Sequence, residues 1–145
     1  MRKFRLARKI TSLKQVPPPT IVLNPTAHQR IANADRTLVE QYGLLALDCS
    51  WNRSEHVFDM NVPGQSRKLP ILLAGNPTNY SVPGKLSTAE AFAAALFITN
   101  FELEARRVLS LFRWGDTFLS LNKEPLLAYA RAKPDELAEI EASFF

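Results

Sequence analysis

The sequence predicts an α/β protein that combines a parallel β-sheet with a mainly helical C-terminal part. Three short segments are apolar almost without interruption, at residues 20–23, 44–47 and 70–74. Strands of this kind are typical of parallel sheets that are buried on both faces, because neither side of such a strand meets water. A segment typical of a helix separates the first two runs, and helix formers dominate after residue 87, which together favour the α/β class.

Helix boundaries follow from residues that favour helix ends. A helix over residues 34–42 is expected to stop at Gly43, since glycine is the usual residue just past a helix C-terminus. Ser87 and Glu90 stand three residues apart before an apolar stretch, and this spacing of a capping box predicts a helix start. Further helices are expected at residues 2–14, 102–112, 117–131 (with a weak point at Pro125) and 134–144.

The composition excludes several kinds of site and location. The 145 residues include one cysteine, Cys49, which rules out an internal disulfide, and His28 and His56 have no spacing that would build a usual zinc site with it. The longest apolar run is far shorter than the roughly 20 residues of a membrane helix. The basic N-terminus lacks the apolar stretch of a secretory signal. We therefore expect a cytoplasmic protein without a metal and without a membrane span.

Charge is distributed unevenly along the chain. The formal net charge is +4, yet residues 1–34 carry seven basic side chains and no acidic one, whereas the stretch from Glu124 onward is mostly acidic. The N-terminal end is therefore a candidate surface for phosphate groups. An exposed helix that keeps its lysines and arginines in water explains the same charge equally well, so charge alone leaves both interpretations open.

Polar, turn-forming residues follow each of the three apolar runs. In parallel sheets, ligands bind beyond the carboxyl ends of the strands, so a shared site is expected there. Taken alone, Asp48 is more often a helix cap or turn residue, and Trp51 more often a core residue, than either is a site residue. The sequence contains no glycine-rich nucleotide-binding motif and no recognisable Ser, His and Asp set.

Six short motifs give the sequence a specific resemblance. They are IVLNP at 21–25, LDCSW at 47–51, LPILLAGNPTNY at 69–80, KLSTAEAFAAALFI at 85–98, FRWG at 112–115 and FLSLN at 118–122. In this order they resemble the ribosome-biogenesis aminocarboxypropyltransferases of archaea and eukaryotes over nearly the whole chain. The resemblance implies a SPOUT-like fold with a trefoil-knot region that binds S-adenosylmethionine. It also implies transfer of the 3-amino-3-carboxypropyl group to an N1-methylated pseudouridine of small-subunit ribosomal RNA.

The resemblance further implies a division of the chain and the residues of the site. Residues 1–68 would form the N-terminal α/β part, and residues 69–145 the mainly helical part with the cofactor loops of the knot. Asp48 is the expected catalytic carboxylate, because the imide nitrogen of the base must lose a proton before it attacks. Matching family positions give the expected cofactor-binding residues, which are Leu47, Trp51, Leu69, Gly84 and Thr88.

The resemblance also implies how two of these residues, Trp51 and Gly84, meet the cofactor. The ring face of Trp51 would favour the positive sulfur of the cofactor and keep water away from it. Gly84 replaces what is often tyrosine in the family, a change that a main-chain contact tolerates.

The resemblance also implies an RNA partner. One extruded nucleotide is expected to enter the site. The expected partner of this monomeric protein is small-subunit rRNA or a pre-ribosomal subunit. The expected RNA-binding residues are Arg2, Lys3, Arg8, Lys9, Arg67, Lys68, Lys85 and Arg113.

One family feature has no counterpart in the sequence. Family members begin with a strand and a loop resembling DPKKCTG, which holds the methionine part of the cofactor, whereas residues 2–4 of this sequence match the segment just after that loop. Either the true start lies upstream or part of the cofactor site has been lost. Two other functions therefore stay open: a SPOUT-type rRNA methyltransferase, and a non-catalytic RNA-binding factor of ribosome assembly.

Overall fold

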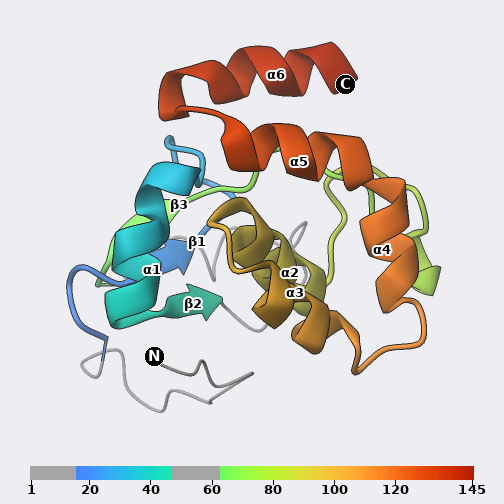
Figure 1. Ribbon diagram of the computed structural model, residues 1–145, viewed down its shortest axis with the longest axis horizontal. Helices are drawn as coiled ribbons and strands as arrows, with labels where there is room; N and C mark the ends of the chain where they lie inside the picture. The colour runs from blue at the N-terminus through green and yellow to red at the C-terminus, as the bar shows by residue number, and fades with distance from the viewer. Residues whose placement is uncertain (1–15, 47–62) are drawn as a thin grey trace.

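A small parallel sheet forms the first half of the fold. The computed structural model describes residues 16–46 and 63–145. Strands β1 (Ile21–Leu23), β2 (Leu44–Ala46) and β3 (Gln65–Arg67) form one sheet in the order β2-β1-β3, with both pairings parallel. Figure 1 shows the sheet beside α1 on the left, with the other helices to the right and above. The predicted α/β class, with a parallel sheet and a helical C-terminal part, is confirmed.

The register of the sheet brings the carboxyl ends of its strands to one edge. Leu23, the last residue of the central strand β1, pairs with Ala46 of β2 on one side and with Arg67 of β3 on the other. All three residues of β1 are buried, as their uninterrupted apolar sequence predicts. The chain therefore leaves all three strands at the same edge, which is where a ligand site is expected in a parallel sheet.

The helix between β1 and β2 agrees with its predicted bounds. A 3-10 turn, η2 (Asn33–Asp35), leads into α1 (Arg36–Tyr42), which packs against β1. Gly43 follows the helix with φ of +85°, and its N–H donates to the carbonyl oxygen of Val39. Since this left-handed region favours glycine, the predicted helix end at Gly43 is confirmed.

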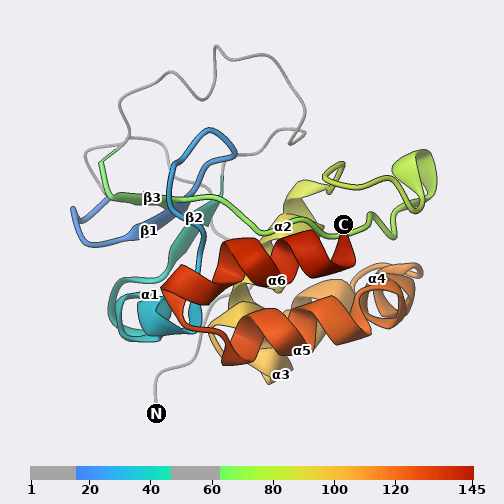
Figure 2. The same cartoon turned by 90° about the horizontal axis from the view of Figure 1, so that it is seen from above.

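Helix α2 (Thr88–Ile98) is the centre of the helical half. Ser87 and Glu90 form the predicted capping box at its start, and nearly every residue from Ala91 to Ile98 is buried. A helix that is apolar all round must be covered on all sides, and α2 packs against α3, α5 and β2. Helices α5 and α6 also pack against each other (Figure 2). The remaining helices are η3 (Pro77–Asn79), α3 (Glu102–Leu109), α4 (Gly115–Leu121), α5 (Lys123–Arg131), η4 (Pro134–Glu136) and α6 (Leu137–Phe144).

Two sequence predictions are wrong in their bounds. The helix expected over residues 117–131 is two helices that meet at Asn122, and Pro125 lies in the first turn of α5. Proline is tolerated there because the first N–H groups of a helix have no partner within the helix. The helix expected to reach residue 112 ends at Leu109. The helix predicted over residues 2–14 lies outside the described residues.

The strand predicted at residues 70–74 is also wrong. This segment is extended but forms only an isolated antiparallel bridge between Leu73 and Pro83, and the third strand of the sheet is β3. The sequence of β3 is Gln-Ser-Arg, which carries no apolar pattern, so sequence analysis missed it. The apolar run made residues 70–74 resemble a buried strand, yet Ile71 is exposed and the main-chain groups of the segment find partners outside the sheet.

Candidate cofactor and RNA site

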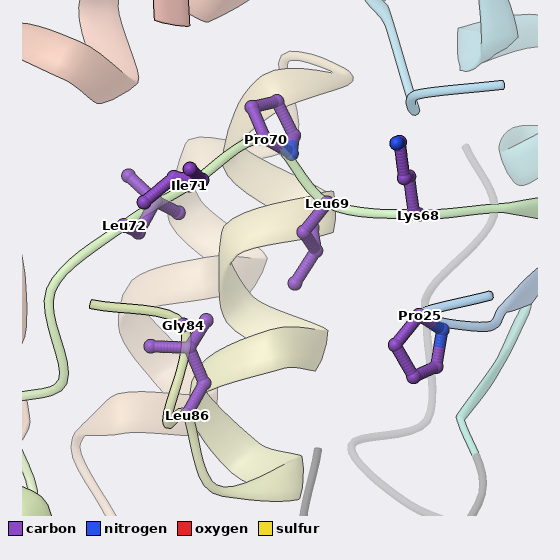
Figure 3. A pocket seen from close by; sticks show the side chains of 8 residues that line it. All are labelled: Pro25, Lys68, Leu69, Pro70, Ile71, Leu72, Gly84 and Leu86. Carbon is purple, nitrogen blue, oxygen red and sulfur yellow. The ribbon is translucent and has the colours of Figure 1, made fainter. Parts of the chain in front are cut away.

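A cavity of about 150 Å³ lies where the sheet meets the helical half (Figure 3). Its lining residues come from the segments after β1 and β3 and from the turn before α2, and they are Pro25, Lys68, Leu69, Pro70, Ile71, Leu72, Gly84 and Leu86. The side chain of Leu69 points between Gly84 and Leu86 on one side and Pro25 on the other. The cavity therefore lies at the edge of the sheet where the strands end.

Side chains from α5 and α6 hold the wall of this cavity. The N–H of Ile71 donates to Oε1 of Glu141 at 2.8 Å, and the hydroxyl of Tyr129 donates to the carbonyl oxygen of Ile71 at 2.9 Å. Glu141 also forms an ion pair with Arg30 at 2.9 Å. Burial raises the pKa of Tyr129 above its usual value, and the negative charge of Glu141 adds to this, so the hydroxyl keeps its proton as a donor.

Asn122, which is fully buried, takes the place of a neighbouring strand for the next part of the wall. Its Oδ1 accepts from the N–H of Leu73 at 2.7 Å, and its Nδ2 donates to the carbonyl oxygen of the same residue at 2.8 Å. Buried main-chain groups need such partners, because leaving them unpaired costs free energy. Asn122 lies between α4 and α5, so the break between these helices supplies a contact to the wall.

The buried carboxylate of Glu90 holds the far end of this wall segment, at Gly75 and Asn76. It accepts from the N–H of Gly75 at 2.6 Å and of Asn76 at 3.1 Å, from Nδ2 of Asn76 at 2.7 Å, and from the N–H of Ser87 at 2.8 Å. Gly75 also packs closely on α4, since a Cβ atom there would lie 2.7 Å from the main-chain nitrogen of Phe118. Glu90 thus joins the start of α2 to the segment that leaves the cavity wall.

The structure brings two of the predicted cofactor-binding residues together. Leu69 and Gly84 both line the cavity, and within the described part of the chain the main-chain N–H and C=O of Leu69 make no hydrogen bond. Thr88 begins α2, two residues after Leu86 of the lining. The predicted site residues Leu47, Asp48 and Trp51 lie outside the described residues.

Known proteins that are similar to this chain identify its family. Residues 21–145 match the profile of the family described as the C-terminal part of ribosome biogenesis proteins. A 16S rRNA aminocarboxypropyltransferase of Methanosarcina acetivorans is 42% identical over 149 aligned residues, which cover 99% of this chain and 83% of the relative. The chain belongs to this transferase family.

A second relative and a solved structure support the same family. The 16S rRNA aminocarboxypropyltransferase of Methanocaldococcus jannaschii is 42% identical over 99% of this chain and 84% of its own length. The structure of the SAM-dependent rRNA:acp-transferase Tsr3 from Vulcanisaeta distributa matches with a TM-score of 0.79 and 39% identity, over 90% of this chain and 72% of that one. The aminocarboxypropyltransferase resemblance that the sequence motifs indicated is confirmed.

The predicted RNA-binding residues that the structure describes differ from one another in burial and in their contacts. Lys68 lines the cavity, Lys85 is half-buried beside Gly84, and Arg113 is exposed between α3 and α4. Arg67 is different, because its side chain is only 12% exposed and its Nε forms an ion pair with Asp35 at 3.3 Å. This placement does not support a role for Arg67 in binding phosphate. The predicted RNA-binding residues Arg2, Lys3, Arg8 and Lys9 lie outside the described residues.

In the described ranges, no group of three His, Cys, Asp or Glu side chains could hold a metal ion. Among the helices of these same ranges, none is both long enough and apolar enough to cross a membrane.

Sequence analysis missed the residues that hold the cavity wall. Glu141 and Asn122 were not singled out, because an isolated carboxylate or amide on a helix is usually exposed. Glu90 was recognised only as part of a capping box. The one available signal was the place of Asn122 at the end of the FLSLN motif, where a buried amide would need main-chain partners.

Proposed function

We propose that this chain transfers the 3-amino-3-carboxypropyl group of S-adenosylmethionine to an N1-methylated pseudouridine of small-subunit ribosomal RNA. The observation that carries the proposal is 42% identity over 99% of the chain to a 16S rRNA aminocarboxypropyltransferase. The cavity supports it, because two residues assigned to the cofactor from family motifs, Leu69 and Gly84, lie on its lining.

The chemistry of the cavity fits the adenine end of the cofactor. Its lining is mostly apolar, and Leu69 offers main-chain groups with which a purine can pair. Its volume of about 150 Å³ is below the roughly 300–1,000 Å³ typical of pockets for whole small-molecule ligands. The described lining therefore suits one ring system, held by Leu69, Gly84 and the neighbouring leucines.

S-adenosylmethionine supplies a sulfonium leaving group, so the transfer needs no metal. The imide nitrogen of the base forms a bond to the carbon next to sulfur, the carbon–sulfur bond breaks, and the sulfur keeps the electron pair in methylthioadenosine. Asp48 takes the proton that the nitrogen loses. Trp51 keeps water from the reacting carbon, and Thr88 adds a polar contact at the start of α2.

The arrangement of the sheet supports a place for Asp48 near the cavity. Ala46, the last residue of β2, is level with Leu23 and Arg67. Two residues after each of those positions, the chain lines the cavity with Pro25 and Leu69. Parallel strands end at one edge, so the end of β2 lies at the same edge as Leu23 and Arg67, and the proposal requires Asp48 there.

The finer properties of the fold and of the partner belong to the same proposal. The knotted SPOUT arrangement and the division into residues 1–68 and 69–145 are proposed from the same family resemblance. The partner is small-subunit rRNA or a pre-ribosomal subunit, bound through Lys68, Lys85 and Arg113 together with the basic residues near the N-terminus. The cytoplasmic location and the monomeric state stay predictions.

Product analysis tests the proposal directly. The chain is incubated with S-adenosylmethionine and small-subunit RNA that carries the N1-methylated pseudouridine, and the small products are separated by chromatography. Methylthioadenosine is expected, together with an RNA mass gain equal to one aminocarboxypropyl group. S-adenosylhomocysteine would instead identify a methyltransferase, and RNA binding without any product would identify a non-catalytic assembly factor.

Trp51→Ala is expected to weaken binding of S-adenosylmethionine by about 1 to 3 kcal/mol, because the loss of a large aromatic ring removes apolar contact with the ligand. Isothermal calorimetry measures the affinity, and circular dichroism checks that the variant keeps its helices. Exposed Phe145 provides a control outside the cavity lining, and Phe145→Ala should bind like the parent. Equal affinity of Trp51→Ala and the parent would remove Trp51 from the site.

A further inference from the structure

The loop at residues 77–84 is built directly on the wall of the cavity. At its base, the N–H of Gly84 donates to the carbonyl oxygen of Leu72 at 2.9 Å, and both residues line the cavity. One step further out, Ala74 donates to the carbonyl oxygen of Val82 at 3.1 Å. Figure 2 shows the loop, in light green, at the periphery of the molecule. The loop thus starts from lining residues of the cavity and extends to the periphery of the molecule.

Hydrogen bonds and backbone geometry hold the loop in one conformation. Oδ1 of Asn76 accepts from the N–H of Asn79 at 3.0 Å, while Nδ2 of Asn76 donates to the buried Glu90. Ser81 has φ of +68°, in the left-handed region that residues other than glycine rarely adopt. Such conformations persist only where the surrounding structure enforces them, and they cluster at functional sites.

Tyr80 precedes this left-handed residue and is the most exposed aromatic residue in the described structure. Its side chain is 56% exposed, the largest fraction among the aromatic residues in the described ranges, ahead of Phe145 at 46% and Tyr42 at 40%. None of the ring contacts found in these ranges involves it. An aromatic ring contributes to stability when it is buried, so the fold gains little from Tyr80 where it lies.

Two lysines, one at the end of the loop and one in the cavity lining, favour a nucleic acid as the partner. Lys85 directly follows the loop and Lys68 lines the cavity, and neither forms an ion pair within the described part of the chain. Lysines that are free of carboxylates can neutralise phosphate groups. An exposed aromatic ring beside such cations is the combination that binds single-stranded nucleic acid, since every base has a face on which a ring can stack.

We propose that Tyr80 stacks on an unpaired base of the RNA substrate, on the loop that leads out from the cavity lining. The base is either the extruded target or its direct neighbour, and Lys68 and Lys85 contact the adjoining phosphates. Extruding a nucleotide costs its stacking energy, and the Tyr80 ring replaces part of that stacking. This inference rests on the proposed function for the identity of the partner as RNA.

The experiment compares Tyr80→Ala and Tyr80→Phe with the parent, with Tyr42→Ala as a matched control, because Tyr42 is a second exposed tyrosine and lies on α1. Fluorescence anisotropy measures the dissociation constant of a labelled small-subunit RNA stem-loop that contains the methylated pseudouridine. Calorimetry measures that of methylthioadenosine. Tyr80→Ala should weaken RNA binding about tenfold, within the range observed for loss of one stacked base. Tyr80→Phe and Tyr42→Ala should bind RNA like the parent, and all variants should bind methylthioadenosine equally.

Three results would overturn the inference. The first is unchanged RNA affinity in Tyr80→Ala. The second is equal weakening in Tyr80→Phe, which would assign the effect to the hydroxyl group instead of the ring. The third is failure of the parent to bind the RNA, which would overturn the proposed function as well. By contrast, release of S-adenosylhomocysteine by a parent whose RNA binding depends on the Tyr80 ring would overturn the proposed transfer reaction alone.

Discussion

Glu90→Ala should lower the free energy of unfolding by at least about 3 kcal/mol, because four hydrogen-bond donors lose their acceptor in a buried place. Those donors are the N–H groups of Gly75, Asn76 and Ser87 and the side-chain amide of Asn76. Each unpaired buried donor costs about 1 to 3 kcal/mol, and partial relaxation with entry of water reduces the sum. Urea denaturation followed by circular dichroism measures the effect.

Two further variants make the Glu90 result interpretable. Glu139→Ala removes a carboxylate from an exposed position on α6 and should change stability by less than about 0.5 kcal/mol. Glu90→Gln keeps the shape of the side chain but replaces one acceptor oxygen with a donor group, so it should lie between the parent and Glu90→Ala. If Glu90→Ala unfolds at the same urea concentration as the parent, the carboxylate does not hold the segment as described.

Asp48→Asn should lower the rate of aminocarboxypropyl transfer in a single turnover by about a hundredfold or more, because an amide cannot accept the proton of the imide nitrogen. Binding of S-adenosylmethionine should change much less, since the lost step follows binding. A rapid-quench assay that follows methylthioadenosine gives the rate, and calorimetry gives the affinity.

The matched control for Asp48 is Asp116→Asn, which makes the same chemical change at an exposed position in the first turn of α4. It should transfer at the rate of the parent. Raising the pH distinguishes the roles of Asp48 further: the Asn variant should recover part of its rate as the base loses its proton to solvent, whereas a variant defective in folding would not. Equal rates for Asp48→Asn and the parent would leave Asp48 as a turn or capping residue.

The sequence was sufficient to predict an element where local chemistry and burial favour the same local structure. The apolar runs at β1 and β2, the glycine after α1 and the capping box before α2 each carry a pattern that only one local structure satisfies well. The family motifs identified the transferase family, and they also selected Leu69 and Gly84, which lie fifteen positions apart but line one cavity. Composition and periodicity gave no reason to place those two residues together.

Only the tertiary structure decided how the segment from Ile71 to Asn76 is held. Its apolar sequence predicts a buried strand, yet main-chain groups of Ile71, Leu73, Gly75 and Asn76 pair with side chains of the helical half, which are Glu141, Tyr129, Asn122 and Glu90. The third strand of the sheet is instead the polar segment Gln65–Arg67, which pairs in parallel with β1. The sequence by itself determined most of the apolar core, because hydrophobicity is a property of each side chain, but it did not show that the polar Glu90 and Asn122 are buried with it. Hydrogen-bond partners far apart in the chain depend on the packing of whole helices, and no local pattern records that.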